Sequence, residues 1–191
     1  MNDHDSDLAS DAVITKPDRG ARRTRLREFQ AQLVERMQAA RSGEQQHASQ
    51  LGVVIGQMRW LLNLQEAGEI MSVGAITKVP LTQAWFLGLT TNRGNLISVI
   101  DFAAYLGGPP THIDKESRIV SFAPALSFNS GLLVSRIMGL RNMSIMELQP
   151  MPQDPSPPWS RNRYVDQDAQ VWTELSLSTI IQDPQFLHVG L

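Results

Sequence analysis

The sequence contains no cysteine, which excludes disulfides, thiolate catalysis and cysteine-ligated metals. Its four histidines lie in unrelated segments, and no pair has the spacing of metal ligands, so we expect no metal and no cofactor. No P-loop, dinucleotide fingerprint or G-x-S-x-G motif is present. These absences leave no recognisable catalytic chemistry, and we predict a protein that is not an enzyme.

Long hydrophobic runs and an excess of one charge are also lacking. No stretch approaches the roughly 20 apolar residues that span a bilayer, and the polar, acidic beginning lacks the apolar region of a secretory signal. The formal net charge is −2, which favours neither nucleic acid nor a strongly acidic partner surface. We therefore expect a cytoplasmic protein without direct membrane insertion.

The first 48 residues predict a tail and then a helix. Residues 1–20 alternate aspartates with small polar residues, which indicates a disordered tail. Over residues 21–48 a narrow apolar stripe recurs at helical spacing, formed by Leu26, Phe29, Leu33, Met37 and Ala40. This stripe predicts an amphipathic helix that packs on the rest of the chain, on a partner helix or on a second copy, as a homo-oligomer. The arginines of residues 19–27 are typical of a solvated helix start, with nucleic acid or anionic lipid as the alternative.

From residue 51 onward the hydrophobic pattern predicts strands. Apolar residues alternate on both sides of Gly56-Gln57, which favours a tight hairpin. The proline-rich linker 107–115 marks a boundary between two halves. Residues 170–177 can be laid without a gap over residues 95–102, and in both segments a strand ends in a potential N-cap, Ser176 or Asp101. This repeat predicts two small β-barrels of like design, over residues 49–110 and 111–191, the second with a C-terminal tail.

Two carboxylates, Glu66 and Glu69, bracket a short segment that fits either a strand or a helical turn. Such a pair can serve acid/base chemistry, but a spacing of three also places both side chains together on a helix surface. Because no histidine or glycine-rich loop lies nearby, we favour the surface interpretation.

The most informative stretch runs from Trp85 to Gly107. It predicts an apolar strand, a turn over residues 92–95, a second strand buried on both faces over residues 96–100, and a short helix capped by Asp101. Gly94 supplies the positive φ that such a turn requires. An apolar run at residues 131–140 predicts a further strand shared between the two barrels, and the prolines of residues 150–158 predict a stiff loop.

The same stretch resembles the CheW-like chemotaxis coupling domain, in which W-x-x-G leads to R-G and then to an apolar strand ending in Asp. Five residues stand in register: Trp85, Gly88, Arg93, Gly94 and Asp101. The sequence departs from the family pattern in Thr91-Asn92 before the arginine, in Ser98 where proline is common, and in Ser135 where an acidic residue is implied. The looser C-terminal similarity looks more like the PilI branch, which serves twitching by type IV pili.

The resemblance implies a mostly β fold of two SH3-like, five-stranded β-barrels packed side by side, preceded by the helix. It also implies an adaptor that couples the cytoplasmic tip of chemoreceptors to the regulatory domain of a CheA-type histidine kinase, at membrane-associated receptor arrays. The implied partner-binding residues are Glu69, Trp85, Arg93, Gly94 and Asn95. The alternative function is a nucleic-acid-binding barrel protein.

Arg93 is the candidate on which the binding prediction depends. Its structural alternative is a surface charge paired locally with Asp101 or Glu69. We favour the binding role because Gly94 already provides the backbone freedom of the turn, which leaves the guanidinium without an obvious structural duty.

Overall fold

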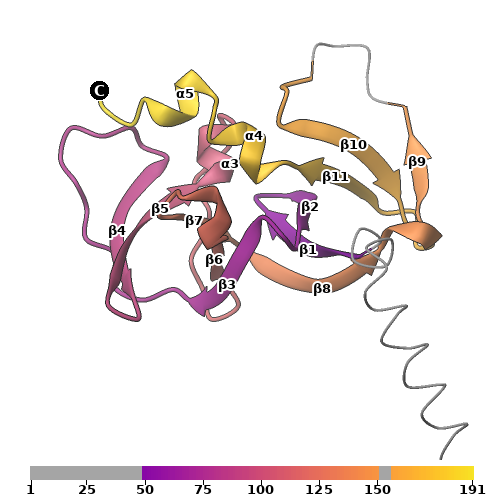
Figure 1. Ribbon diagram of the computed structural model, residues 1–191, viewed down its shortest axis with the longest axis horizontal. Coiled ribbons are helices and arrows are strands. Elements are labelled where there is room, and N and C mark those ends of the chain that lie inside the picture. Colours follow the sequence, from indigo (N-terminus) through magenta and orange to yellow (C-terminus); the bar gives the residue numbers. More distant parts are fainter. Residues whose placement is uncertain (1–48, 151–155) are drawn as a thin grey trace, which may run out of the picture. The chain divides into compact units, whose positions relative to one another are not determined.

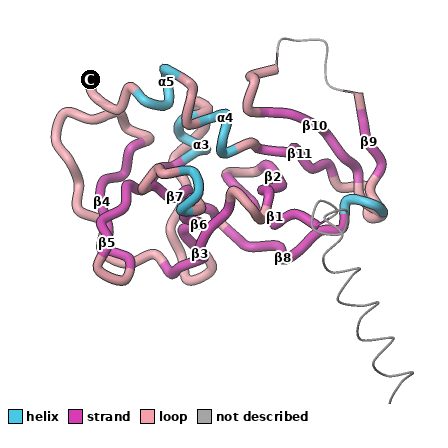
Figure 2. The backbone as a smooth tube through the Cα atoms, in the orientation of Figure 1, coloured by secondary structure: helices cyan, strands magenta, loops and turns pink. Residues whose placement is uncertain are grey.

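Strands are the main secondary structure of the computed structural model, which describes residues 49–150 and 156–191. The strands are β1 (Ser49–Ile55), β2 (Met58–Asn63), β3 (Ala67–Ser72), β4 (Phe86–Asn92), β5 (Asn95–Asp101), β6 (Arg118–Phe122), β7 (Ser130–Val134), β8 (Arg136–Asn142), β9 (Glu147–Gln149), β10 (Ser160–Val165) and β11 (Val171–Leu175). The short helices are α3 (Phe102–Tyr105), α4 (Leu177–Ile180) and α5 (Pro184–Leu187), with 3₁₀ turns η1 (Pro124–Leu126) and η2 (Met143–Ile145). Figure 2 shows how little of the described chain is helical, so the prediction of a mostly β protein is confirmed.

The strands form two mixed sheets (Figure 1). The five-stranded sheet has the order β3-β6-β7-β5-β4, and the six-stranded sheet has the order β8-β1-β2-β11-β10-β9. Each sheet contains one parallel pair, β5 with β7 and β2 with β11, and its other pairs are antiparallel. The prediction of five strands in each unit fails for the second sheet because the short strand β9 adds to its edge beside β10.

The two sheets repeat one design, as the overlay of residues 95–102 and 170–177 predicted. The hairpin β4–β5 leads into α3, and the hairpin β10–β11 leads into α4. Asp101 is the N-cap of α3 and Ser176 is the N-cap of α4, at equivalent positions after their strands. The parallel neighbours also correspond, since Ser98 pairs with Ser130 on β7 and its counterpart Thr173 pairs with Trp60 on β2.

The sheets do not divide the chain at residue 110. Strands β1 and β2 join β8–β11, while β3–β5 join β6 and β7, so each sheet takes strands from both predicted halves. The run 131–140, expected as one strand, breaks at Ser135 into β7 of one sheet and β8 of the other. The Ser135 N–H donates to the Val54 carbonyl at 2.8 Å, which fixes this crossing. The sequence predicted one strand shared between the two units. The run does serve both units, but as two strands, one in each sheet.

The hairpins follow the turn chemistry of the sequence. Gly56 has φ 60° between β1 and β2, where Ile55 pairs with Met58, which confirms the predicted tight turn. Strand β5 is buried on both faces as predicted, with Val99 and Ile100 at 0% and 2% exposure, except at its first positions. Leu96 is 57% exposed because it lies beside the turn, where no described element covers it.

A chain of aromatic rings fills the core beneath the short helices, which gather on one side of the described domain in Figure 1. Phe102 packs edge-on against Trp60 and Trp159, with ring centroids 5.5 and 5.3 Å apart. Tyr105 of α3 packs edge-on against Phe186 of α5 at 5.4 Å, so the C-terminal segment covers this end of the core. Burial, together with the nearby Asp183 carboxylate, raises the pKa of Tyr105 to about 12. Phe186 of the C-terminal tail is 2% exposed, so this residue belongs to the core.

The predicted tail over residues 1–20 and the predicted helix over residues 21–48 lie outside the described residues. Among the helices that the structure describes, none is long and apolar enough to cross a membrane.

Candidate functional site

The β4–β5 hairpin carries Arg93 at a turn of unusual backbone conformation. Asn92 and Asn95 close a two-residue turn in which Arg93 has φ 47° and Gly94 has φ 85°. Both central residues are left-handed, as in type I′ turns, which match the twist of the flanking strands. The sequence predicted this conformation for Gly94 only. An arginine with positive φ is uncommon, and the left-handed region costs a residue with a Cβ about 1–2 kcal/mol.

Glu69 on strand β3 holds this turn from the side. Its Oε1 accepts from Arg93 Nη2 at 2.6 Å, and its Oε2 accepts from Asn92 Nδ2 at 3.2 Å. The Arg93 side chain nevertheless stays 78% exposed, whereas that of Glu69 is 37% exposed. Of the two local partners that the sequence left open for Arg93, the structure selects Glu69, since Asp101 caps α3. An exposed ion pair of this kind contributes only about 0–1 kcal/mol, so it orients the guanidinium more than it stabilises the fold.

The position of Glu69 is itself fixed by an irregularity between β3 and β6, where the register shifts between Ala67 and Ile70. There Ser121 Oγ accepts from the Glu69 N–H at 2.8 Å and donates to the Glu69 carbonyl at 3.1 Å. A Cβ at Gly68 would lie 2.7 Å from the same Ser121 Oγ, so only glycine fits beside it. Sequence reasoning missed Ser121 and Asn92, because neither contact follows from local spacing.

A shallow groove of about 380 Å³ adjoins the turn. Glu69, Arg93 and Asn95 line its polar side, and Ile97 and Phe128 line its apolar side. The structure thus brings four of the five predicted binding residues to one surface, because Gly94 lies between Arg93 and Asn95 in the same turn.

Trp85 is the exception among the predicted binding residues. It is 8% exposed, its ring stacks on Phe186 at 5.9 Å, and it packs edge-on against Tyr105 at 5.3 Å. Its carbonyl accepts from the Asp101 N–H at 2.8 Å. The side chain therefore belongs to the core and offers almost no surface to a partner.

Glu66 and Glu69 do not act as a pair of carboxylates. Glu69 lies in strand β3, whereas Glu66 precedes that strand and reaches the start of α4. The Glu66 carboxylate accepts from the N–H groups of Leu177 at 2.6 Å and Ser178 at 3.3 Å, and from the Ser178 hydroxyl. Of the two alternatives for this segment, the structure has the strand, and the duty of Glu66 is to cap a helix that lies more than 100 residues away in sequence.

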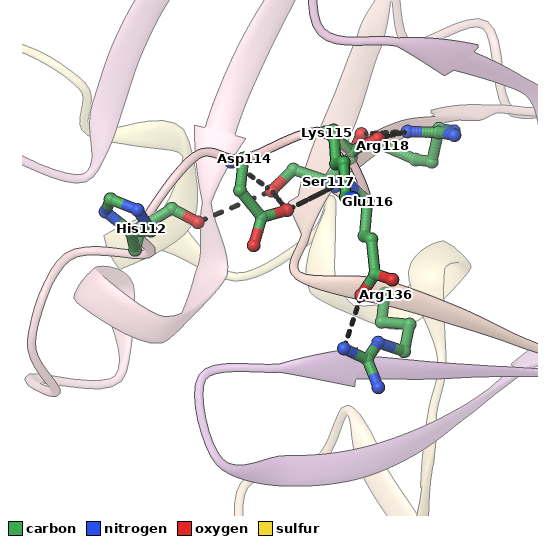
Figure 3. Close-up of polar contacts among 7 residues, drawn as sticks. All are labelled: His112, Asp114, Lys115, Glu116, Ser117, Arg118 and Arg136. Atoms are coloured by element: carbon green, nitrogen blue, oxygen red, sulfur yellow. Dashed lines mark hydrogen bonds and ion pairs between the residues drawn. The ribbon is translucent and has the colours of Figure 1, made fainter.

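Figure 3 shows a second polar cluster, which begins in the predicted linker 107–115 and continues to the start of β6. The Ser117 hydroxyl donates to the carbonyl of His112 at 3.4 Å, and the Asp114 N–H donates back to that hydroxyl at 3.0 Å. Hydrogen bonds from the backbone of Glu116 and then of Ser117 hold the pKa of Asp114 below its usual range. Glu116 also forms an ion pair with Arg136 on β8. The chain has serine at position 135, where the resemblance implies an acidic residue, and the carboxylate beside the neighbouring Arg136 comes from Glu116 of the loop.

The β10–β11 hairpin is closed by Asp166, which the sequence did not single out. Its carboxylate accepts from the Gln170 N–H at 2.9 Å and from the Trp172 indole at 2.8 Å. Burial alone would raise the pKa of Asp166, but these hydrogen bonds outweigh it and lower the pKa. Arg141 lies over the Trp172 ring at 4.7 Å and adds to the same effect.

Within the described ranges, no group of three or more histidine and acidic side chains is arranged to hold a metal ion. The arrangement at the β4–β5 turn is that of a presented cation, fixed in orientation and open to a partner. Its chemistry suits recognition of a carboxylate, because guanidinium makes bidentate contacts with that group.

The CheW-like domain model matches residues 50–185 of the chain. Protein FrzA of Myxococcus xanthus is 24% identical over 98 residues, covering 51% of this chain and 61% of that protein. Protein PilI of Pseudomonas aeruginosa is 24% identical over 97 residues, covering 51% of this chain and 54% of that protein. The matched segment therefore spans little more than half of these relatives.

Among solved structures, the scaffolding protein TtCheW from Thermoanaerobacter tengcongensis matches with a TM-score of 0.57. The match covers 68% of this chain and 89% of that chain at 20% identity. At this identity the likeness shows the fold alone.

Proposed function

The chain belongs to the CheW-like domain family, and on this premise we propose that it is a non-enzymatic adaptor of a chemosensory system. In this proposal it couples the cytoplasmic tips of chemoreceptors to the regulatory domain of a CheA-type histidine kinase. It would do so in the cytoplasm, at membrane-associated receptor arrays. The relatives FrzA and PilI favour a role of this kind, and the similarity to PilI motivates a link to type IV pilus twitching.

The observation that carries the proposal is the presentation of Arg93. The side chain is 78% exposed although it is anchored to Glu69 at 2.6 Å, and its backbone adopts a strained conformation that glycine would adopt more easily. Arginine at such a position lowers the stability of the fold, and a binding contact with another protein would explain why this position holds an arginine. We place the kinase-binding or receptor-binding contact on the surface of Glu69, Arg93, Gly94 and Asn95.

The test is calorimetric binding of the full chain to the regulatory domain of its cognate kinase, and separately to a chemoreceptor tip. We expect Arg93→Ala to weaken one of these associations by about 1–3 kcal/mol, the range for an interface arginine. Arg93→Lys keeps the charge but loses the planar fork, so it should recover only part of the affinity. Arg161→Ala is the matched control, because Arg161 is an exposed arginine of the other sheet, on β10.

Melting curves of the same variants separate binding from folding. Unchanged affinity of Arg93→Ala for both partners would contradict the assigned surface. Loss of folded protein would show that the arginine is structural. Retention of the chain on DNA or RNA at physiological ionic strength, with no binding to the kinase domain, would favour the nucleic-acid-binding alternative instead.

A further inference from the structure

A second groove lies away from the Arg93 turn, on the six-stranded sheet. It is a groove of about 680 Å³ across β2, β10 and β11, and it reaches the end of α3 at Leu106. Part of its apolar lining is open to solvent: Met58 is 49% exposed, and Leu106 and Val171 are each 40% exposed. A volume of this size lies within the range of binding sites.

The internal repeat shows what the other sheet does at the equivalent place. Because Ser98 and Thr173 correspond, their partners Ser130 and Trp60 correspond as well, and two residues earlier Phe128 corresponds to Met58. Phe128 is half-buried, since it packs on Phe122 at 5.7 Å and is covered by Phe186 of α5 at 6.2 Å. In the six-stranded sheet, no described segment covers Met58 as α5 covers Phe128.

Among the described residues that line the groove, the charged side chains are all positive. Arg59 and Arg163 are the charged residues among its lining, and neither forms an ion pair with a carboxylate in the part of the chain that the structure describes. Trp60 also lines the groove and is 2% exposed, yet its indole Nε1 has no hydrogen-bond partner among the described residues. Because the ring and its Nε1 are buried, a partner in the groove meets mainly the exposed side chains around Trp60.

From these observations we propose that the groove binds an acidic segment of a partner protein. The segment places one large apolar side chain against Met58 and Val171, as Phe186 is placed on Phe128, and its carboxylates face Arg59 and Arg163. Methionine suits this role because its flexible side chain adapts to different partners. This site is separate from the Arg93 surface, and it does not depend on the function proposed above.

The probe is a displayed library of random dodecapeptides selected against the full chain. We expect the enriched peptides to carry Asp or Glu within a few positions of a large apolar residue. A synthetic peptide from this set should shift the Trp60 indole N–H resonance of the labelled chain. Arg163→Glu should weaken its binding by at least tenfold, and Met58→Asp should do the same.

Two control variants make the result specific to the groove. Arg161→Glu makes the same charge reversal on the same strand outside the groove, and it should leave the affinity within twofold of the parent. Arg93→Ala should also leave it unchanged, which separates this site from the proposed kinase or receptor contact. Failure to enrich any peptide would overturn the proposal. Enriched peptides that lack acidic residues, or that still bind Arg163→Glu, would overturn it as well.

Discussion

The carboxylate of Glu66 offers the sharpest test of how the two sheets are held together. It lies in the connection between β2 of the six-stranded sheet and β3 of the five-stranded sheet, and it caps α4 after β11. Replacing it by alanine leaves the N–H groups of Leu177 and Ser178 and the Ser178 hydroxyl without this acceptor. Hydrogen bonds to a charged group contribute about 1.5–3 kcal/mol each. Because Glu66 is only half-buried, water can replace part of them, and we expect Glu66→Ala to cost about 2–4 kcal/mol.

Glu69→Ala is the matched control, three residues along the same segment. Its carboxylate bonds the exposed side chain of Arg93, and an exposed ion pair contributes about 0–1 kcal/mol. The assay is urea unfolding followed by tryptophan fluorescence and circular dichroism, with thermal melting as a second measure. A loss of 2–4 kcal/mol corresponds to roughly 5–15 °C in Tm for a chain of this size. Equal losses for the two variants, within about 0.5 kcal/mol, would refute the assignment of Glu66 as a cap between distant segments.

Two further predictions concern a close backbone contact and a depressed pKa. Gly88 has φ 129°, and a Cβ there would lie 2.1 Å from the Thr77 carbonyl oxygen, so Gly88→Ala should cost more than about 3 kcal/mol. Gly94→Ala, which meets open space and only a positive φ, should cost about 1–2 kcal/mol in the same urea titration, and equal costs would contradict this ranking. The lowered pKa of Asp166 stabilises the fold above the unfolded pKa of about 4, and this contribution is lost as pH falls through the lower folded value. Asp166→Asn should therefore flatten the pH dependence of stability below about pH 4, and a parallel acid-unfolding profile would count against it.

The parts of the fold that the sequence predicted are those that local chemistry decides. Gly56 closes the first hairpin and Asp101 caps the first helix, because a turn or a cap requires particular residues at adjacent positions. The repeat of strand, cap and short helix at Ser176 was visible for the same reason. The turn at Arg93 was also predicted, although its positive φ was assigned only to the glycine.

The parts that could not be predicted depend on contacts between distant segments. The sorting of strands between sheets follows from the crossing at Ser135, where an apolar run leaves one sheet and enters the other without any turn signal. The burial of Trp85 depends on Phe186, about 100 residues later, and the role of Glu66 depends on α4. An alternating apolar pattern shows that a residue faces a core, but it does not show which segment covers it. Four of the five predicted binding residues lie together because they belong to one turn and the strand beside it.

The two caps of the internal repeat lead to a last prediction, since each helix start receives one carboxylate by a different route. At α3 the carboxylate belongs to the N-cap itself: Asp101 accepts from the N–H groups of Ala103 and Ala104 at 3.1 and 3.3 Å. At α4 the N-cap is Ser176, and the carboxylate comes from Glu66.

Introducing the residue of the first repeat into the second, Ser176→Asp, would place two carboxylates at one buried helix start. Both would compete for the Ser178 N–H, and like charges in such a site repel strongly. We expect Ser176→Asp alone to cost about 2–4 kcal/mol, by analogy with other unpaired buried charges. Adding Glu66→Gln removes the second charge. The double variant should therefore lose at least about 1 kcal/mol less stability than the two single variants lose together. A double-mutant cycle in urea measures this coupling. Strict additivity would mean that the two side chains do not share the start of α4. The two caps would then be equivalent in backbone geometry only, and a single carboxylate would not be a requirement common to both.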